Sequence, residues 1–334
     1  MKKTLRWLNI LLIFVTLLSY LSPFVDPANY WPFAFIGIAY PWLLLLNMLF
    51  ILAWVALKNW YFLFSLGCIL VGWNHFQSFI GLNTAAPIAE KEITVMTFNA
   101  FGYRQLKKEA RKKFDQMLAT YQPDLIAMQE GASRSSPIDP SVYPYVYHPK
   151  GKLLSIHSKH PFANKGKLDF GNTSNGCIFV DLKVHSRPFR IYNVHLQSNG
   201  VSGDASKIKN EGDLQQKETW LDIKGMLGKV KRATAKRSAQ TKAVIEHLKT
   251  SKLPVIVCGD MNDTPLSYTY QSFANNLEDG FKERAMGTGT TYDGTIPVLR
   301  IDYIWTDADF QVQSHQIIKE NFSDHYPVIS RIRL

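Results

Sequence analysis

The chain has 334 residues, long enough for one large domain and an appendage, and its formal net charge is +11. Its three cysteines are too few for a disulfide framework, which excludes a small disulfide-stabilised scaffold. The basic balance favours anionic partners such as nucleic acid, phosphoesters or an acidic membrane surface, and a solvated basic surface would give the same net charge.

The first 82 residues are almost free of charge and differ in this from the rest of the chain. Apolar runs at 5–21, 33–57 and 60–80 are each about as long as a bilayer-spanning helix. The first run has the basic start of a signal peptide, but residues 19–23 lack a small-x-small cleavage site and two further runs follow. We therefore expect residues 1–82 to form a three-span transmembrane anchor.

The distribution of Lys and Arg predicts how this anchor is oriented. Three bases precede the first apolar run and Lys58 lies between the second and third, whereas segments 22–32 and 81–90 contain no Lys or Arg. We expect a multi-pass anchor in the inner membrane of the cell. We expect its N-terminus to lie in the cytoplasm. The remainder of the chain is then extracytoplasmic.

Residues 83–92 are expected to be a linker, after which strands and helices alternate. A polar segment at 199–210 is expected to be a loop. Because the stretch 140–195 has strands without helices between them, an α+β sandwich of two sheets with outer helices is favoured over a doubly wound sheet. Strands are expected at 93–98, 125–128, 145–148, 153–157, 177–184, 190–195, 255–258, 301–305 and 327–332. Helices are expected at 107–121 and at 214–249, the latter as one long helix or as two broken near Gly225 and Gly228.

Polar or ionisable residues recur within or directly after the apolar runs. The clearest case is Gly259-Asp260-Met261-Asn262, which follows the apolar run 254–258. Side chains at i and i+2 of an extended chain point to the same side, so Asp260 and Asn262 can face one reaction centre. Strand ends at one edge of a sheet converge, and we expect a shared cleft that also contains Asn99, Glu130, His195, Asp302, Asp324 and His325.

Each of these residues, taken alone, also has a structural explanation. Asn99 suits a turn or cap, Glu130 a surface charge, and His195 a satisfied core histidine. Asp302 lies inside an apolar strand and is the hardest to explain in this way, because an unpaired buried carboxylate is costly. The functional interpretation depends on the whole set.

The ordered set resembles the endonuclease/exonuclease/phosphatase superfamily, also called the deoxyribonuclease-I-like fold, in a membrane-anchored, bacterial-type form. The resemblance covers about residues 93–334, which it implies are a catalytic domain. It implies a four-layer α/β/β/α sandwich of two mixed β-sheets with flanking helices. The N-terminal helical transmembrane segment precedes this domain and lies outside the resemblance. The landmarks are Thr97-Phe98-Asn99, Gln129-Glu130, Asn193-Val194-His195-Leu196, Gly259-Asp260-Met261-Asn262, Ile301-Asp302-Tyr303 and Ser323-Asp324-His325-Tyr326-Pro327-Val328.

The resemblance also implies a divalent metal. Glu130 is then the main Mg²⁺ ligand, with Asn99 beside it and Asp324 close to the metal, and Mn²⁺ is an alternative ion. Such a site suits a hard cation that takes one or two carboxylates and keeps several waters. The number of metals stays open.

The remaining residues receive roles around the phosphate by the same resemblance. Asp260 orients or deprotonates the attacking water, and Asn262 helps to hold the phosphate. His325, oriented by Asp302, contacts the scissile phosphate, and His195 binds it from the other side. The identity of the general base stays open.

Two departures narrow the branch of the superfamily. His195 in an N-x-H-L setting is similar to the deoxyribonuclease, sphingomyelinase and inositol-phosphatase branches. Apurinic endonucleases have Q-E-T-K, whereas Gly131-Ala132 follows Glu130 here. Repair of abasic DNA is therefore not expected.

A basic segment, 222–242, has seven bases and Asp222 as its only acid. It is either a solvated helix face or a surface that steers nucleic acid or anionic headgroups. Within it, Arg237 and Gln240 are also candidates to face the sheet. Aromatic residues are not interleaved with the bases, which weakens a single-stranded nucleic-acid interpretation. The candidate steering residues are Lys229, Arg232, Lys236 and Arg237.

The sequence thus predicts a membrane-anchored, Mg²⁺-dependent phosphoesterase that hydrolyses phosphodiester or phosphomonoester bonds by in-line attack of water. Its substrate is a nucleic acid, a phospholipid headgroup or a small phosphoester, and no obligate protein partner is inferred. The alternative is a catalytically silent module that binds a phosphorylated ligand or partner, which the intact acidic set argues against. A transporter is excluded, because the apolar runs contain almost no charge.

Overall fold

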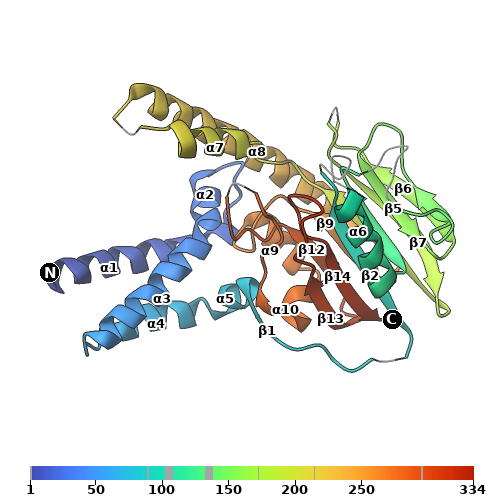
Figure 1. Cartoon of the computed structure of the whole chain (residues 1–334), viewed down its shortest axis with the longest axis horizontal. Helices are drawn as coiled ribbons and strands as arrows, with labels where there is room; N and C mark the ends of the chain where they lie inside the picture. The colour runs from blue at the N-terminus through green and yellow to red at the C-terminus, as the bar shows by residue number, and fades with distance from the viewer. Residues whose placement is uncertain are drawn as a thin grey trace.

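The computed structural model describes residues 2–88, 90–101, 108–131, 138–171, 173–213, 215–294 and 296–334. Two six-stranded mixed sheets lie face to face, and helices cover their outer faces (Figure 1). The predicted starts of the two helices, at 107 and 214, lie outside the described residues, and so does Ala132.

The first sheet, called here the β9 sheet, is formed by strands from residues 162 to 306. Its spatial order is β10 (Glu278–Asp279), β12 (Asp302–Thr306), β9 (Val255–Asp260), β8 (Arg187–His195), β7 (Gly176–Val184) and β6 (Phe162–Leu168). The second, called the β2 sheet, has the order β13 (Gln311–Ile317), β14 (Val328–Arg333), β2 (Glu92–Asn99), β3 (Leu125–Gln129), β5 (Leu154–Ser158) and β4 (Tyr145–Tyr147).

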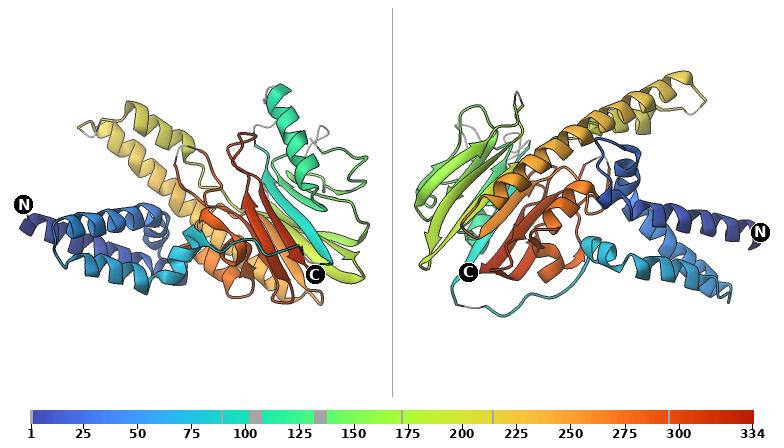
Figure 2. Two further views of the ribbon diagram at one scale, coloured as in Figure 1. Left: turned by 60° about the horizontal axis from the view of Figure 1, so that its bottom comes forward. Right: turned by 180° about the vertical axis from the view of Figure 1, so that it is seen from behind.

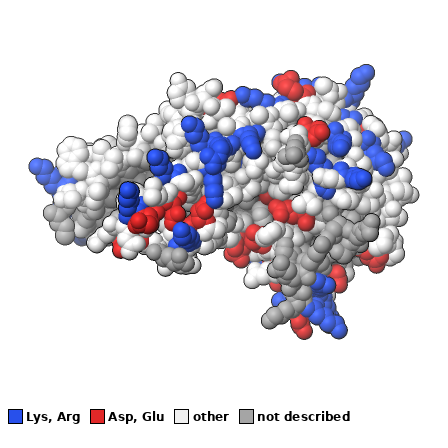
Figure 3. Space-filling model, turned by 90° about the horizontal axis from the view of Figure 1, so that it is seen from above, with Lys and Arg blue, Asp and Glu red and all other residues white. Residues whose placement is uncertain are grey.

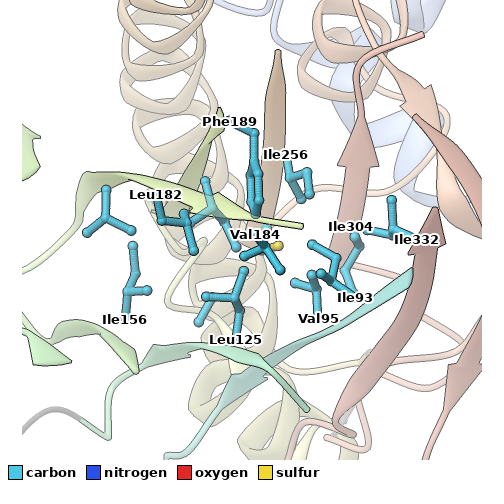
Figure 4. Packing of buried hydrophobic residues seen from close by; sticks show 14 of the residues in the cluster. Ile93, Val95, Leu125, Ile156, Leu182, Val184, Phe189, Ile256, Ile304 and Ile332 are labelled. Carbon is cyan, nitrogen blue, oxygen red and sulfur yellow. The ribbon is translucent and has the colours of Figure 1, made fainter. Parts of the chain in front are cut away.

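The core between the sheets consists of the inward side of the apolar strands (Figure 4). Side chains alternate across a strand, so every second residue enters this layer. Val95 of β2, Leu125 of β3 and Ile256 of β9 are fully buried there. This burial joins the two sheets into one sandwich.

Two outer layers complete the sandwich. Val244 and Leu248 of α8 (Lys217–Lys249) and Phe273 of α9 (Tyr268–Ala274) pack on the β9 sheet. Phe114 and Met117 of α6 (Lys108–Tyr121) pack on the β2 sheet. The expected α/β/β/α order is therefore present, with the short α10 (Gly280–Arg284) beside β12 and β13.

The expected loop at 199–210 is wrong, because α7 (Ser202–Glu211) forms there and packs against α8 as a hairpin. Its polar sequence hid it, since ion pairs to α8 replace an apolar face, as between Asp204 and Lys229. Of the two forms expected for the second helix, one long or two broken, the structure has the single long helix α8. At Gly225 and Gly228 the backbone stays helical, because a helical glycine costs only about 1 kcal/mol.

The N-terminal region is helical but not a three-span anchor. It contains α1 (Lys2–Ser19), a short 3₁₀ turn at Ser22–Phe24, α2 (Pro32–Ile38), α3 (Tyr40–Ala56), α4 (Phe62–Val71) and α5 (Trp73–Phe79). By length and composition, one helix, Lys2–Phe24, could cross a membrane, or two if α2 and α3, bent by 53°, count as one. The multi-pass prediction is not supported, because the expected third span is divided at Gly72, against the ring of Tyr20.

The N-terminal helices extend from one side of the sandwich and pack against it (Figure 2). Ser238 of α8 donates to Asp26 Oδ1 at 2.7 Å, and Arg300 Nη1 donates to the carbonyl of Ser78 at 2.7 Å. β1 (Ile80–Leu82) pairs with β11 (Met286–Thr288). The expected linker then follows β13 as an extended segment in which the amide of Ala86 donates to Gln313.

Candidate active site

The predicted site residues meet at one edge of the sandwich because of strand direction and register. Strands β2 and β3 run parallel, and Asn99 is opposite Gln129 where they end. Strands β8 and β9 also run parallel and end with His195 opposite Asp260. Asp302 begins the antiparallel β12 and is opposite Asp260 on its other side. The strand ends of the two sheets thus face each other across this edge.

A buried amide pair links the sheets directly behind this edge. Gln129 Nε2 donates to Asn193 Oδ1 at 2.7 Å. Asn193 Nδ2 donates in turn to the carbonyl oxygens of Met128 and Ser155, both at 2.8 Å. Glu130 directly follows Gln129, and His195 is two residues after Asn193. The Gln129–Asn193 pair therefore sets the distance across which Glu130 and His195 face each other. Both amides were part of the recognised motifs, yet the sequence indicated no role for them.

Asn99 lies between two carboxylates. Its Nδ2 donates to Glu130 Oε1 at 3.2 Å and to Asp260 Oδ2 at 3.0 Å. Its Oδ1 accepts from the amide of Phe101 at 3.1 Å. The amide therefore bridges the acids, whereas the predicted metal ligation would need its oxygen to face the cleft.

Glu130 is the carboxylate most open to the cleft. Its backbone has a φ of 57° just after β3, and its amide donates to Leu153 at 2.7 Å, so the chain turns sharply here. The side chain is 27% exposed, and Oε1 lies 3.5 Å from His195 Nε2. This openness leaves oxygen lone pairs for a cation or a substrate.

Asp260 is buried and held by the turn that follows β9. Its Oδ1 accepts from the amide of Asn262 at 2.8 Å, and its Oδ2 accepts from Asn262 Nδ2 at 3.1 Å. Gly259 makes this strand end possible, because it has a φ of 139° and any Cβ would lie 1.9 Å from the carbonyl oxygen of Val194. The predicted pair Asp260 and Asn262 does face one centre.

Asp302 and His325 form a buried pair. His325 Nδ1 lies 2.9 Å and 3.1 Å from the two carboxylate oxygens of Asp302, and the ring of Tyr292 packs edge-on against His325. Burial alone would lower the pKa of His325, but the carboxylates of Asp302 and Asp260 outweigh it and raise that pKa to about 10. The imidazolium form is thereby favoured at neutral pH, with Nε2 3.9 Å from Asp260.

His195 closes the acidic group from the other side. Its Nε2 lies 3.5 Å from Glu130 and 3.7 Å from Asp260, and its buried Nδ1 has no hydrogen-bond partner among the described residues. A buried ring nitrogen without a partner is costly. The described residues thus leave one nitrogen of this ring unsatisfied.

The donor set fits a divalent cation. Asp260, Asp302 and the neutral form of His325 each offer a ligand atom, and these atoms lie within 4.8 Å of one another. While His325 is protonated, the ligands left to a cation are the carboxylate oxygens. Glu130 adds an open carboxylate, so the described site has more acid than its imidazoles can neutralise. Oxygen-rich sites of this kind suit Mg²⁺ or Mn²⁺.

The other predicted residues are placed differently. Asp324 lines the same cavity, and its Oδ1 accepts from Ser323 Oγ at 3.1 Å. Arg237 is wrong as a steering residue, since it is fully buried and donates to Asp263 at 3.0 Å and to Gln197 O at 2.6 Å. Lys229 is exposed but paired with Asp204, whereas Arg232 and Lys236 are exposed. Basic and acidic side chains are intermingled over this face (Figure 3).

These residues open into a cavity of about 510 Å³, lined by Glu130, Asp260, Asn262, Asp324 and His325 at one end. Tyr292, which the sequence did not indicate, also lines it. A polar group this concentrated at the end of a cavity is typical of a catalytic centre.

Two families match the chain. The Endonuclease/Exonuclease/phosphatase family matches residues 96–325, and a domain of unknown function (DUF8431) matches residues 2–79. Human Nocturnin is 25% identical over 238 residues, which are 62% of this chain and 52% of that protein. The chain thus spans about half the length of this relative.

Solved structures show the same fold. The human Nocturnin catalytic domain with bound sulfate has a TM-score of 0.53 at 21% identity, covering 77% of this chain and 98% of that one. An endonuclease/exonuclease/phosphatase from Bacteroides vulgatus has a TM-score of 0.51 at 16% identity, covering 73% of this chain and 100% of that one. A mannosyl-6-phosphatase from Bacteroides thetaiotaomicron has a TM-score of 0.50 at 14% identity, covering 72% and 100%.

Proposed function

The chain belongs to the Endonuclease/Exonuclease/phosphatase family, and we propose that it hydrolyses a phosphoester at the edge formed by Glu130, Asp260 and His325 with the help of Mg²⁺ or Mn²⁺. The observation that supports this most is the buried Asp302–His325 pair facing Asp260. The sulfate bound by the Nocturnin catalytic domain is a tetrahedral oxyanion, as a phosphoester is.

In this proposal each residue acts on a different atom of the reaction. Asp260 accepts a proton from a water molecule while the oxygen of that water bonds to phosphorus. The bond between phosphorus and the leaving oxygen breaks in the same step. His325, positively charged and oriented by Asp302, donates through Nε2 to a phosphoryl oxygen. His195 contacts the phosphate from the opposite side. Asn262 holds Asp260 in place, because its Nδ2 donates to Asp260 and to Leu196 O in place of the phosphate contact expected from the sequence. The leaving oxygen takes its proton from solvent.

Glu130 and Asp324 are the proposed metal ligands at the open side of the cleft. A bound divalent cation offsets the negative charge that develops on the phosphoryl oxygens. Asn99 would then orient Glu130 through its Nδ2 hydrogen bond, in place of the direct ligation that the sequence predicted.

The test is a metal-dependent activity screen of the full chain in detergent against DNA, RNA, phospholipids and phosphomonoesters. We expect hydrolysis of one class that EDTA abolishes and that Glu130→Gln lowers about 100-fold or more. Glu109→Gln, on the exposed start of α6, is the matched control and should match the wild type.

Calorimetric titration with Mn²⁺ provides a readout besides activity, and Glu130→Gln should weaken this binding. Activity that persists in EDTA and in Glu130→Gln would refute the site. Mn²⁺ binding without hydrolysis of any class would favour the silent binding module.

We also propose that residues 2–79 hold the protein in a membrane. The outer faces of α1 and α3 are apolar and exposed, as at Phe14 (63%) and Leu52 (65%). Between the helices lie polar contacts, such as Asn9 Nδ2 to Ser65 Oγ at 2.8 Å and Trp54 Nε1 to Asn9 Oδ1 at 2.9 Å. Apolar residues outside and polar hydrogen bonds inside are typical of a helix bundle in lipid.

The same bundle suggests an orientation. Arg6 lies over the ring of Tyr61, so the basic start of α1 and the turn after Lys58 are at one end of the bundle, and the catalytic part is at the other (Figure 1). With the basic end in the cytoplasm, the catalytic part is extracytoplasmic. Retention of the full chain in membranes after an alkaline carbonate wash is the measurement for the anchor.

A further inference from the structure

The cavity at the active site is lined by two chemically different groups of residues. Glu130, Asp260 and His325 are polar, whereas Phe35, Ile38 and Trp42 are apolar. The latter three belong to α2 and the start of α3, in the N-terminal region. A region outside the catalytic fold thus provides a wall of the catalytic cavity.

A second apolar wall comes from the α7–α8 hairpin. Val201, just before α7, and Met226 and Val230 of α8 line the cavity opposite the catalytic strands. Helix α2 packs against α8, and in Figure 1 it lies directly beside the hairpin. The cavity thus combines one polar group of residues with two apolar walls.

The N-terminal wall is closely docked. At Gly37 of α2 a Cβ would lie 2.1 Å from the carbonyl oxygen of Leu266, so the helix and the catalytic part approach as closely as a glycine allows. Asp26 accepts from Ser238 Oγ at 2.7 Å and pairs with Lys242, both on α8. These contacts make Ile38 and Trp42 a constant part of the site.

The lining also indicates which phosphoester fits. Among the described residues that line the cavity, none is a lysine or an arginine. Binding of a nucleic-acid backbone depends on several such contacts to successive phosphates. A single phosphate beside apolar walls instead matches a molecule with one charged group and a hydrocarbon part.

We propose that the substrate is a membrane lipid with a phosphoester headgroup, whose phosphate lies at Glu130, Asp260 and His325 and whose hydrocarbon part lies against Ile38, Trp42 and Met226. This proposal rests on the proposed hydrolase function. The outer faces of α1 and α3 are the exposed apolar surfaces described above. Trp42 of the wall is on α3 itself, and Ile38 is on the adjoining α2. A lipid would reach the phosphate site along these helices.

The experiment measures chain-length dependence with the full protein in lipid nanodiscs. Two matched pairs of probes cover both ester types, namely methyl and octyl phosphate and methyl and octyl 4-nitrophenyl phosphate. For the pair that is hydrolysed, we expect kcat/KM of the octyl ester to exceed that of the methyl ester at least tenfold, because the chain adds buried apolar area. We expect Ile38→Asn to lower this octyl-to-methyl ratio at least fivefold.

Ile88→Asn is the matched control, since Ile88 is 85% exposed in the segment before β2 and should leave the ratio at the wild-type value. Met226→Asn tests the same wall from α8 and should act like Ile38→Asn, which guards against misfolding of α2. Partition of the octyl ester into the disc is equal for all variants, so their ratios report the wall. A hexadecyl ester confined to the disc should also be hydrolysed.

Three results would overturn the inference. An octyl-to-methyl ratio near one in the wild type, or unchanged in both wall variants, removes the hydrocarbon site while the hydrolase function stands. Hydrolysis of the octyl but not the hexadecyl ester removes the membrane as the source. Oligonucleotides hydrolysed faster than every alkyl ester, and equally by Ile38→Asn, would assign a nucleic acid. Failure of the proposed function is distinct, since no ester is then hydrolysed with Mg²⁺ or Mn²⁺.

Discussion

At the scale of single residues, Asp302 and His325 act as one unit. Asp302 contacts the imidazole at the Nδ1 edge and leaves Nε2 directed toward Asp260. The carboxylate therefore fixes the orientation of the ring and favours its charged form. Neither residue retains its role without the other.

We expect Asp302→Asn and His325→Ala each to lower kcat/KM about 100-fold or more, and the double variant to be at most a few-fold worse than either single one. Residues that act as a unit show this non-additivity. Steady-state kinetics of the three variants on the best substrate is the measurement. A double variant as slow as the product of the single effects would mean that the two residues act independently.

Residue identities at the site were largely predictable, whereas side-chain orientation was not. Strand ends gave Asp260, Asp302 and His195, because polar groups after apolar runs are conspicuous in a sequence. Asn99 was placed correctly, but its oxygen is engaged by the amide of Phe101. The sequence left Arg237 open between a steering role and a place facing the sheet, and the packing of α8 shows that it is buried against Asp263.

At the scale of elements, the turn after β9 is the most constrained. Gly259 combines a φ of 139° with the closest approach to a neighbouring strand, 1.9 Å from a Cβ to Val194 O. A side chain here must either move β8 away from β9 or distort the strand end, and both would displace Asp260 from His195.

We expect Gly259→Ala to destabilise the fold by about 2 kcal/mol or more, because strain and overlap add. Gly225→Ala is the matched control, since a Cβ there meets nothing within 4 Å and should stabilise α8 by about 0.5–1 kcal/mol. Thermal unfolding of both variants in one detergent compares them. Equal unfolding temperatures would show that β8 yields without cost.

Elements with an apolar period were predicted well, and elements held by other forces were not. Strands β3 and β9 read clearly because both faces are buried. Edge strand β6 was missed because five of its seven positions are polar or glycine or alanine, and β13 because Gln313, Ser314 and His315 are buried polar residues. Helix α7 depends on charges that belong to α8.

At the scale of the whole molecule, the N-terminal helices are the part that the sequence described least well. Composition indicated three apolar runs, but it could not show the bend between α2 and α3 or the division at Gly72. Nor could it show that residues 26, 37 and 78 contact the catalytic part, because such contacts depend on residues more than 200 positions away.

If the outer faces of these helices contact lipid, a lysine placed there will weaken the anchor. We expect Leu11→Lys combined with Leu52→Lys to lower the fraction retained after a carbonate wash, because a lysine at the centre of a bilayer helix costs about 2.5–3.5 kcal/mol. Ile88→Lys, at a still more exposed position outside the helices, should be retained like the wild type. Equal retention of all variants would show that these faces do not lie in lipid.

The short distance between Gly37 and Leu266 has a consequence for where catalysis can occur. An enzyme on a flexible tether samples a volume around its attachment point that grows with the length of the tether. Here the segment before β2 is hydrogen-bonded to β13 at Ala86, and α2 packs against α8. The N-terminal helices are therefore joined to the catalytic part by direct contacts as well as by the linker. If residues 2–79 hold the protein in a membrane as proposed, the cleft stays at one height above the bilayer, and the proposed lipid substrate reaches it by diffusing in two dimensions.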